Sequence, residues 1–323
     1  MHRSLAFLAA ILLTCLCVAS AGLAARPGSL SFSIEPAGSA DLVQLALRDR
    51  SEGRNNNWSS TVALAELRGL DPARLRAAGS APLSFALVRE AGRFDCRGAG
   101  GRSAARGDCS FAPDPAFAAF LASRGIGRPS RDQAYALAMS SVGRGHVEAL
   151  AANHYPTPTI DQLVAMGIHG ASPRFIQDLA STGYRLRSVE DLVTFRIHGV
   201  DAAYIRAMAA AGAPFRDLPG DDLVAFRIHG VSPDLVSTYS RLGTRGLDRD
   251  GVLAMAIHGV TPRYIEDLAR LGYRGLTADE LVEMRIFGVT ADYIRSLQQA
   301  GNGRLSVGQL VQMRILGHRP RGR

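Results

Sequence analysis

The pattern of hydrophobic and polar positions changes near residue 112. Before it, apolar and polar residues alternate with the two-residue period of a β-strand, and turn-forming residues separate the alternating runs. The clearest runs are 30–34, 42–47, 83–88 and 93–96, with turns at 49–57 and 91–92. A short helix is expected in this part, near Asp71, Pro72 and Ala73. The segment predicts a small antiparallel sheet.

Beyond residue 112 an Ile-marker-Gly motif recurs at a nearly constant period. The marker positions are His169, His198, His229, His258, Phe287 and Leu316, with steps of 29, 31, 29, 29 and 29 residues. A degenerate first copy has Ser140 at this place, one step of 29 before His169. Seven copies at one period indicate stacked structural units, the last of them truncated.

Each unit carries the signals of two short helices. A capping residue stands ten residues before the marker in every copy except the fourth, where Pro219 takes its place. These residues are Ser130, Thr159, Ser188, Asp248, Thr277 and Ser306, and capping boxes are completed by Gln133, Gln162, Glu280 and Gln309. The glycine after the marker ends the first helix in a left-handed conformation.

The second helix begins three residues past the marker and ends at a further glycine. Its N-caps are Ser172, Asp201, Ser232, Thr261 and Thr290, and its terminal glycines are Gly183, Gly212, Gly243, Gly272 and Gly301. A valine before the N-cap and an aliphatic residue four positions after it form a hydrophobic staple in four copies. Helices of about ten residues are unstable alone, so stacking must supply the core.

The fold class that follows is α+β, with a small antiparallel β head followed by an all-α array of two-helix repeats, similar to an α-solenoid. The expected divisions are a signal peptide at 1–21, a β-rich head at 22–112, a linker helix at 113–129, the repeat array at 130–317 and a basic tail at 318–323. The linker helix starts at Asp114 and Pro115 and stops at Gly125.

The first 21 residues have the features of a secretory signal. Arg3 is the charged region, 5–18 the apolar region, and Ala19-Ser20-Ala21 a small-residue cleavage site, with Ala24 as a second option. An uncleaved anchor stays open as an alternative, and Cys15 lies in a poor match to a lipobox. The sequence contains no later stretch apolar enough to span a bilayer, and we expect a periplasmic or secreted protein of the bacterial envelope.

Two cysteines remain after removal of the signal. Cys96 and Cys109 are flanked in mirror order by Phe94 and Phe111, about a Gly-, Ala- and Arg-rich connection at 98–107. This register pairs Cys with Cys and Phe with Phe across one hairpin, which predicts a disulfide in an oxidising compartment. A metal site on two cysteines is the weaker alternative, because no further ligands lie nearby in the sequence.

Composition removes several functions from consideration. All 37 basic residues are arginine, so no P-loop lysine, Schiff-base lysine or Ser–Lys dyad exists. The formal charge of +8 comes from the head and from three arginines in the tail, over a neutral array. This distribution argues against nucleic acid as a partner, although the Gly-Val-Ser/Thr-Pro corner resembles helix-hairpin-helix modules locally. No enzyme motif is present, and the sequence predicts no cofactor.

Two repeated polar series are candidate functional residues. The histidines at the marker are interpreted as packing at helix C-termini, because Phe and Leu fill the same place in two copies. The arginines Arg196, Arg227, Arg285 and Arg314 stand eight residues after the first N-cap, between core positions. They must snorkel, cap carbonyls or pair with acids such as Glu190, Asp221 and Asp279, or else line a surface for an acidic partner or anion. Trp58 is expected in the core at a strand edge, with an exposed stacking role as its alternative.

The repeat at 257–273, with its Ile-His-Gly-Val-Thr-Pro-Arg-Tyr-Ile run, resembles repeats of poorly characterised bacterial proteins. Some of these are fused to membrane metallopeptidases of the penicillinase-antirepressor sensor class. The head, from Phe85-x-Leu-Val-Arg to Phe111, is similar to the segment that precedes such repeats, so the resemblance covers about 40–317. The peptidase motif is missing, so no catalytic residue carries over and the resemblance implies sensing or scaffolding.

The sequence thus predicts an exported, non-catalytic repeat protein that binds another envelope protein or a ligand. The alternative is an envelope protein that binds an anionic ligand or nucleic acid through its repeated arginines.

Overall fold

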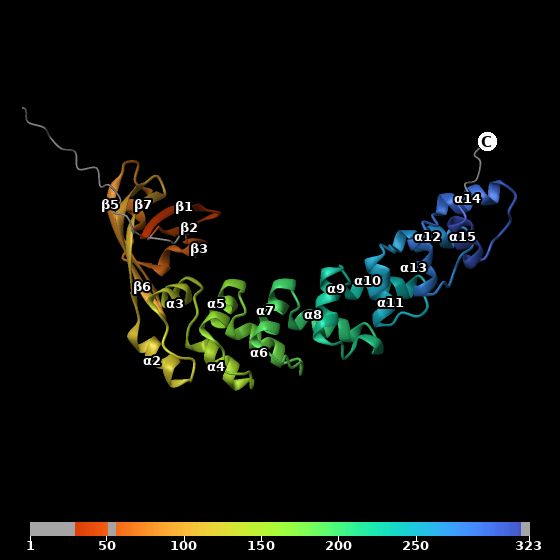
Figure 1. Ribbon diagram of the computed structural model, residues 1–323. Helices are drawn as coiled ribbons and strands as arrows, with labels where there is room; N and C mark the ends of the chain where they lie inside the picture. Colours follow the sequence, from red (N-terminus) through yellow and green to blue (C-terminus); the bar gives the residue numbers. More distant parts are fainter. Residues whose placement is uncertain (1–29, 51–55, 318–323) are drawn as a thin grey trace, which may run out of the picture. The chain divides into compact units, whose positions relative to one another are not determined.

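The computed structural model describes residues 30–50 and 56–317 (Figure 1). It contains two compact units, a β unit formed by 30–50, 56–87 and 94–111 and a helical unit formed by 88–93 and 112–317. The predicted α+β class, with a β-rich head before a helical array, is confirmed. The predicted signal peptide and basic tail lie outside the described residues.

The β unit is one antiparallel sheet with strand order β3-β2-β1-β7-β6-β5-β4. Its strands are β1 Leu30–Ala37, β2 Ser39–Asp49, β3 Asn56–Ala63, β4 Leu67–Arg68, β5 Ala81–Arg89, β6 Gly92–Gly101 and β7 Ala104–Pro113. A 3₁₀ turn at Leu64–Glu66 and the helix α1 at Pro72–Arg76 connect them. The helix α1 lies where the sequence predicts a short helix, and the Asp71 side chain caps it. Phe32, Ile34, Leu45 and Leu47 point to the buried side, as their alternation predicts.

The hairpin of β6 and β7 carries the disulfide. The sulfurs of Cys96 and Cys109 are bonded, with Cα atoms 4.0 Å apart, and the rings of Phe94 and Phe111 lie 4.7 Å apart between centroids. The predicted register is therefore confirmed.

The predicted long connection at 98–107 is wrong, because both strands continue through it. The turn is only Arg102 and Ser103, with φ of 55° and 65°, as in a two-residue type I′ turn. Glycine is required in these strands by close approach, since a Cβ on Gly98 would lie 2.1 Å from the Arg106 carbonyl oxygen. The segment 98–107, whose Gly- and Ala-rich composition is typical of a loop, therefore forms a tightly packed pair of strands.

Trp58 lies in β3, the edge strand, opposite Leu47 of β2. The predicted strand edge is confirmed, although the ring is half-buried rather than part of the core. The predicted turn at 49–57 extends too far, because Asn56 and Asn57 already belong to β3.

The helical unit begins with α2 Pro115–Ser123, capped by Asp114 as predicted. The first helices of the seven repeats are α3 Arg131–Met139, α5 Ile160–His169, α7 Val189–His198, α9 Gly220–Ile228, α11 Arg249–Ile257, α13 Ala278–Ile286 and α15 Val307–Ile315. The second helices are α4 Arg144–Ala152, α6 Pro173–Ala180, α8 Ala202–Ala210, α10 Pro233–Arg241, α12 Pro262–Arg270 and α14 Ala291–Gln299.

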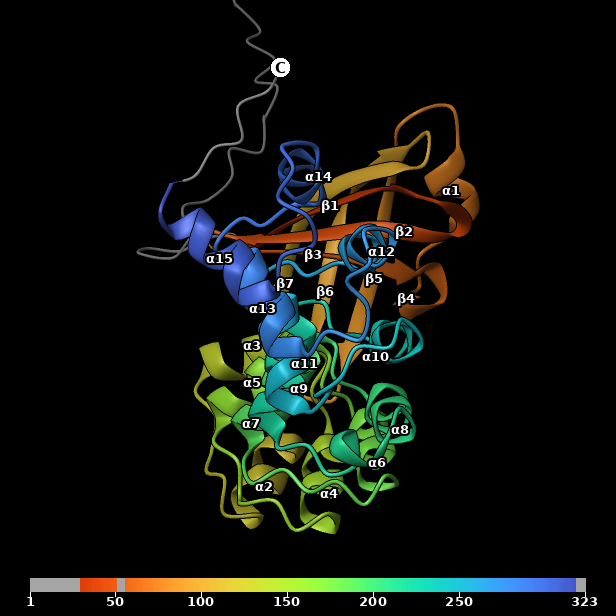
Figure 2. The same cartoon turned by 90° about the vertical axis from the view of Figure 1, so that its right-hand side faces the viewer.

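Successive first helices pack on one another, and most successive second helices do the same. Figure 2 shows the first helices in one layer, here the A layer, and the second helices beside them in another, here the B layer. Between the layers lies a buried core, built in each A helix by the fourth and seventh residues after the N-cap, such as Leu281 and Met284.

The predicted N-caps and the glycines after the marker lie at helix ends. The side chains of all the predicted N-caps accept a backbone N–H, and Pro219 has no side-chain bond. The glycines after the marker have φ between 66° and 72°. In the degenerate first repeat Ser141 takes this place with φ of 56°, an uncommon conformation for a residue with a Cβ.

Candidate functional site

The predicted arginine series lies at the junctions between repeats. Each guanidinium reaches back to the preceding repeat and donates to a carbonyl at the end of its A helix. The Nε atoms of Arg196 and Arg227 donate to Gly170 and Gly199 at 3.0 and 2.8 Å. Carbonyls at a helix C-terminus have no partner within the helix, so the arginines cap them from the next repeat.

Each of these arginines also stacks on an aromatic ring of the preceding repeat. Arg196 lies over Phe175, Arg227 over Tyr204, Arg285 over Tyr264 and Arg314 over Tyr293, at 4.1 to 5.6 Å from the ring centroids. The hydroxyls of Tyr204 and Tyr264 donate to Val231 and Val289 in the corner of the next repeat, at 2.8 and 2.6 Å. Neighbouring repeats therefore hold each other in both directions.

The arginine and a phenylalanine or tyrosine at the ring position are present or absent together within this chain. The fourth repeat has Leu235 at the aromatic position, and the next repeat has Ala256 at the arginine position. The first repeat has His146 there, and the second has Gly167. This pairing ties the arginines to the ring beneath them, and it is explained by contact between repeats without an outside anion.

The histidines lie at the C-termini of the A helices, as predicted, but the packing interpretation holds for only part of the series. His169, His229 and His258 are exposed, and His198 is half-buried. Among the described residues, no group of three or more His, Cys, Asp or Glu side chains could hold a metal ion. The marker position is therefore mostly a surface position, which tolerates Phe and Leu because it is not enclosed.

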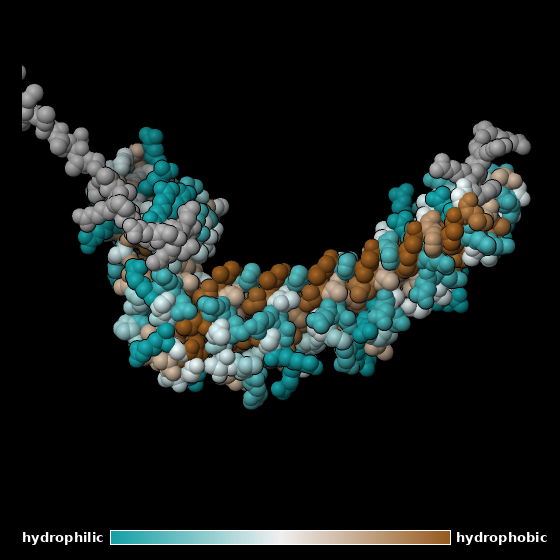
Figure 3. All heavy atoms as spheres, in the orientation of Figure 1, coloured by the Kyte–Doolittle hydropathy of each residue, from teal (hydrophilic) through white to brown (hydrophobic). Residues whose placement is uncertain are grey.

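The sequence analysis missed the isoleucine beside the marker. Six consecutive repeats expose this side chain, with 50% to 67% of its surface accessible. They are Ile168, Ile197, Ile228, Ile257, Ile286 and Ile315, here the isoleucine row. Figure 3 shows hydrophobic side chains in bands that recur along the array. An apolar surface repeated at one position marks an interaction surface rather than scattered exposure.

Helical geometry could have revealed this row. The isoleucine follows the N-cap by nine residues, whereas the core residues follow by four and seven. At 100° per residue, position nine points about 140° and 160° away from these core positions. The signal was hidden because the motif is apolar and repeated, which is also the pattern of a core residue.

A second row lies on the same outer face, at the other end of each A helix. The second residue after the N-cap is acidic and exposed in six repeats. These residues are Asp132, Asp161, Glu190, Asp221, Asp250 and Asp279, here the acidic row. Positions two and nine are separated by about two helical turns, so they share one face about 10 Å apart.

Within the third and fourth repeats, the outer face contains a hollow of about 420 Å³. Its lining includes Pro219 and Gly220, which follow the loop that is two residues longer. Gly220 stands at the first helical position, which holds Val189 in the preceding repeat. The walls are Tyr184, Phe195 and Val224, with the carboxylates of Asp191 and Asp221 and the exposed residues Arg185 and Arg187. Burial, followed by the negative charges of Asp221, Asp222 and Asp191, raises the pKa of Tyr184 to about 12.

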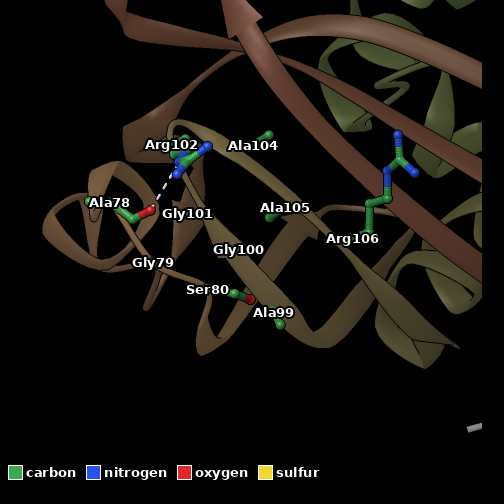
Figure 4. Close-up of a pocket in the computed structure, with 10 residues that line it drawn as sticks. All are labelled: Ala78, Gly79, Ser80, Ala99, Gly100, Gly101, Arg102, Ala104, Ala105 and Arg106. Carbon is green, nitrogen blue, oxygen red and sulfur yellow. Dashed lines mark hydrogen bonds between the residues drawn. The ribbon is translucent and has the colours of Figure 1, made fainter. Parts of the chain in front are cut away.

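A hollow of about 570 Å³ in the β unit has a different origin. Figure 4 shows that it is lined by small residues around the β6–β7 turn, with Arg102 held by a hydrogen bond of 3.0 Å from its Nε to the Ala78 carbonyl. A Cβ on Gly101 would lie 2.2 Å from the Gly79 carbonyl oxygen. The small lining residues are thus explained by close backbone packing.

Comparison of the chain with protein-family models, with curated proteins and with solved structures gives no match. Within the described ranges, no helix combines the length and the apolar character needed to cross a bilayer.

Proposed function

We propose that this is an exported, non-catalytic repeat protein of the bacterial envelope, which binds another protein along the outer face of its A layer. The observation that carries the proposal is the isoleucine row, six exposed side chains at one position of six repeats. Repeat arrays present such extended surfaces because each unit adds one more copy of the same side chain.

The energy available from this surface suits a binding role. Burying the exposed half of an isoleucine side chain contributes roughly 1 kcal/mol, so the row supplies on the order of 5 kcal/mol before the costs of association. Leaving these side chains in water brings no stability to the fold itself. A bound partner explains why the same exposed residue recurs.

The test is capture by crosslinking in the cell envelope, with matched variants of the full chain. Ile197, Ile228 and Ile257 are replaced together by serine, and the control replaces the exposed B-layer residues Arg174, Arg263 and Arg295 by serine. The expected result is a crosslinked protein that is lost with the isoleucine variant and kept with the control. Equal capture by all three proteins would contradict the proposal.

Export is tested separately from binding. The mature protein from the extracytoplasmic fraction should begin at Gly22, or at Ala25 if cleavage follows Ala24. A protein that stays in the cytoplasm with residues 1–21 intact would remove the envelope from the proposal.

The arginine-based alternative makes a different prediction. Capture of an anionic ligand through Arg196, Arg227, Arg285 and Arg314 should weaken steeply as salt rises. The capped carbonyls and stacked rings occupy these guanidinium groups, which is why we favour the isoleucine row.

A further inference from the structure

The outer face of the A layer offers a negative charge to a partner. The acidic row runs parallel to the isoleucine row, and no ion pair or hydrogen bond within residues 30–50 and 56–317 engages the carboxylates of Asp161, Asp221 and Asp279. Four of the isoleucines directly follow Arg196, Arg227, Arg285 and Arg314, whose Nε atoms donate to carbonyls of the neighbouring repeat. The carboxylates of Asp161, Asp221 and Asp279 are therefore left for a partner on this face, where Arg185 and Arg187 beside the hollow are also exposed.

The spacing of the rows fits a helix laid across the repeats. Packed helices lie about 8–10 Å apart, so each repeat advances both rows by about that distance. Seven residues of an α-helix also cover about 10 Å, so one heptad of a partner helix matches one repeat. Such a helix would place one apolar side chain per heptad on the isoleucine row and a neighbouring flank over the acidic row.

The hollow in the third and fourth repeats provides a defined position for one cation. Phe195 and Val224 offer apolar walls to an aliphatic stem, and Asp221 offers a carboxylate to its charged end. The carboxylate of Asp191 also faces this space, although one of its oxygens accepts from the backbone N–H groups of Arg187 and Ser188. Gly220 keeps this space open, because a Cβ there would stand 3.4 Å from the Phe195 ring and from the Tyr184 hydroxyl. In the other repeats this position holds Arg131, Ile160, Val189, Arg249, Ala278 and Val307.

We propose that the occupant of this face is a basic amphipathic helix of a partner protein, with apolar residues on the isoleucine row, cations on the acidic row and one Lys or Arg side chain in the hollow beside Gly220. The inference rests on the proposed function and adds the chemistry of the partner. The positive charge required of the partner is a demanding condition, because the chain as a whole is also basic, at +8, and would attract acidic peptides non-specifically.

The test measures binding of a labelled 28-residue helical probe peptide, designed with leucine at every seventh position and lysines on one flank, to the full chain by fluorescence anisotropy. A second peptide has glutamate in place of each lysine. We expect the basic peptide to bind at least about tenfold more tightly than the acidic one at low salt, and to lose affinity as salt rises. Equal or tighter binding of the acidic peptide would overturn the proposal.

Variants locate the effect on the face. Asp161, Asp221 and Asp279 are changed together to asparagine, and the control changes the exposed B-layer residues Asp178, Asp234 and Asp292 to asparagine, which removes the same charge. The A-layer variant should lose about tenfold in affinity for the basic peptide, and the control less than twofold. Gly220→Ala should weaken binding of the basic peptide and leave binding of the acidic peptide unchanged. Equal losses in the two aspartate variants would show diffuse attraction and contradict the inference.

The same variants separate this inference from the proposed function. If envelope crosslinks vanish with the isoleucine variant but survive the A-layer aspartate variant, the surface binds a partner that is not basic. If crosslinks survive the isoleucine variant, the proposed function itself is wrong. Sedimentation that shows an isoleucine-dependent dimer, or co-sedimentation with phosphatidylcholine vesicles, would assign the face to a second copy or to a lipid surface instead.

Discussion

The guanidinium of Arg227 lies 4.1 Å from the ring centroid of Tyr204, in the preceding repeat. The Tyr204 hydroxyl in turn donates to the carbonyl of Val231, at the corner of the repeat that contains Arg227. This reciprocal contact fixes the relation between two units that have little stability alone. Cooperativity along the array depends on such junctions between neighbours.

Removal of this arginine should destabilise the array. Arg227→Gln loses a hydrogen bond to a helix C-terminal carbonyl and a cation–π contact, which together stabilise the fold by about 1–2 kcal/mol. Urea unfolding followed by circular dichroism measures the loss. Arg263→Gln is the control, since that arginine is exposed and makes only a long surface ion pair of 3.8 Å with Asp267. Equal midpoints for the two variants would contradict the junction role.

Substitution of a corner glycine that has a positive φ should destabilise the fold. Gly230 has φ of 71°, so Gly230→Ala costs about 1 kcal/mol although its Cβ would meet no atom within 4 Å. Gly308 lies inside α15 with equally open space and no positive φ, so Gly308→Ala should stabilise by up to about 1 kcal/mol. Opposite shifts of the unfolding midpoint are the expected result, and shifts in the same direction would refute the conformational argument.

The buried tyrosines predict a loss of stability in alkali. Burial raises the pKa of Tyr204 and Tyr264 to about 12 in the folded protein, with Arg227 and Arg285 acting weakly in the opposite direction. The unfolded value is about 10, so the folded state binds more protons between these values. The stability that Tyr204 and Tyr264 contribute is fully present below about pH 10, and it is lost as the pH rises toward 12.

Unfolding curves at pH 8, 10 and 11.5 measure this dependence. Tyr264→Phe should be less stable at pH 8, because the bond from its hydroxyl to Val289 is lost, yet its stability should fall less between pH 10 and 11.5. An identical pH dependence in this variant and the parent protein would contradict the assignment to Tyr264.

Most of the fold could be predicted because its signals are local. The N-caps from Ser130 to Ser306 and the glycines after the marker determine helix ends through contacts within four residues. The register of Cys96 and Cys109 was readable because the flanking phenylalanines fix the symmetry of the hairpin. The turn at Arg102 and Ser103 could not be predicted, because the close approach of two strands depends on residues that are distant along the chain.

The candidate surface was harder to predict than the fold. An isoleucine repeated in six of the seven units, such as Ile197, has the composition and the period of a core residue, and only its angular position separates it from Leu192. The aromatic partner of each arginine lies in the preceding repeat, about 21 to 23 residues earlier, so the stacking of Arg227 on Tyr204 becomes visible only when units are packed.

The disulfide should contribute measurably to the β unit. It closes a loop with a sequence separation of 13 residues, for which the chain-entropy estimate is about 3 kcal/mol. Thiol titration of the unreduced mature protein should detect no free thiol. The double variant Cys96→Ala and Cys109→Ala should unfold at lower urea concentration in the sheet signal, while helical unfolding changes little. Two reactive thiols in the unreduced protein would contradict the bond.

Substitutions in one A helix should separate the exposed row from the core. Ile228 is 58% exposed, so Ile228→Ser should change the free energy of unfolding by less than about 0.5 kcal/mol and increase solubility. Leu223, five residues earlier, is 2% exposed, so Leu223→Ala should cost about 2–5 kcal/mol. Urea unfolding at two protein concentrations makes the comparison, because a loss for Ile228→Ser that grows with concentration would show that the row is already buried in self-association. A large loss independent of concentration would mean that Ile228 packs within its own chain, and the binding surface would then lose its main support.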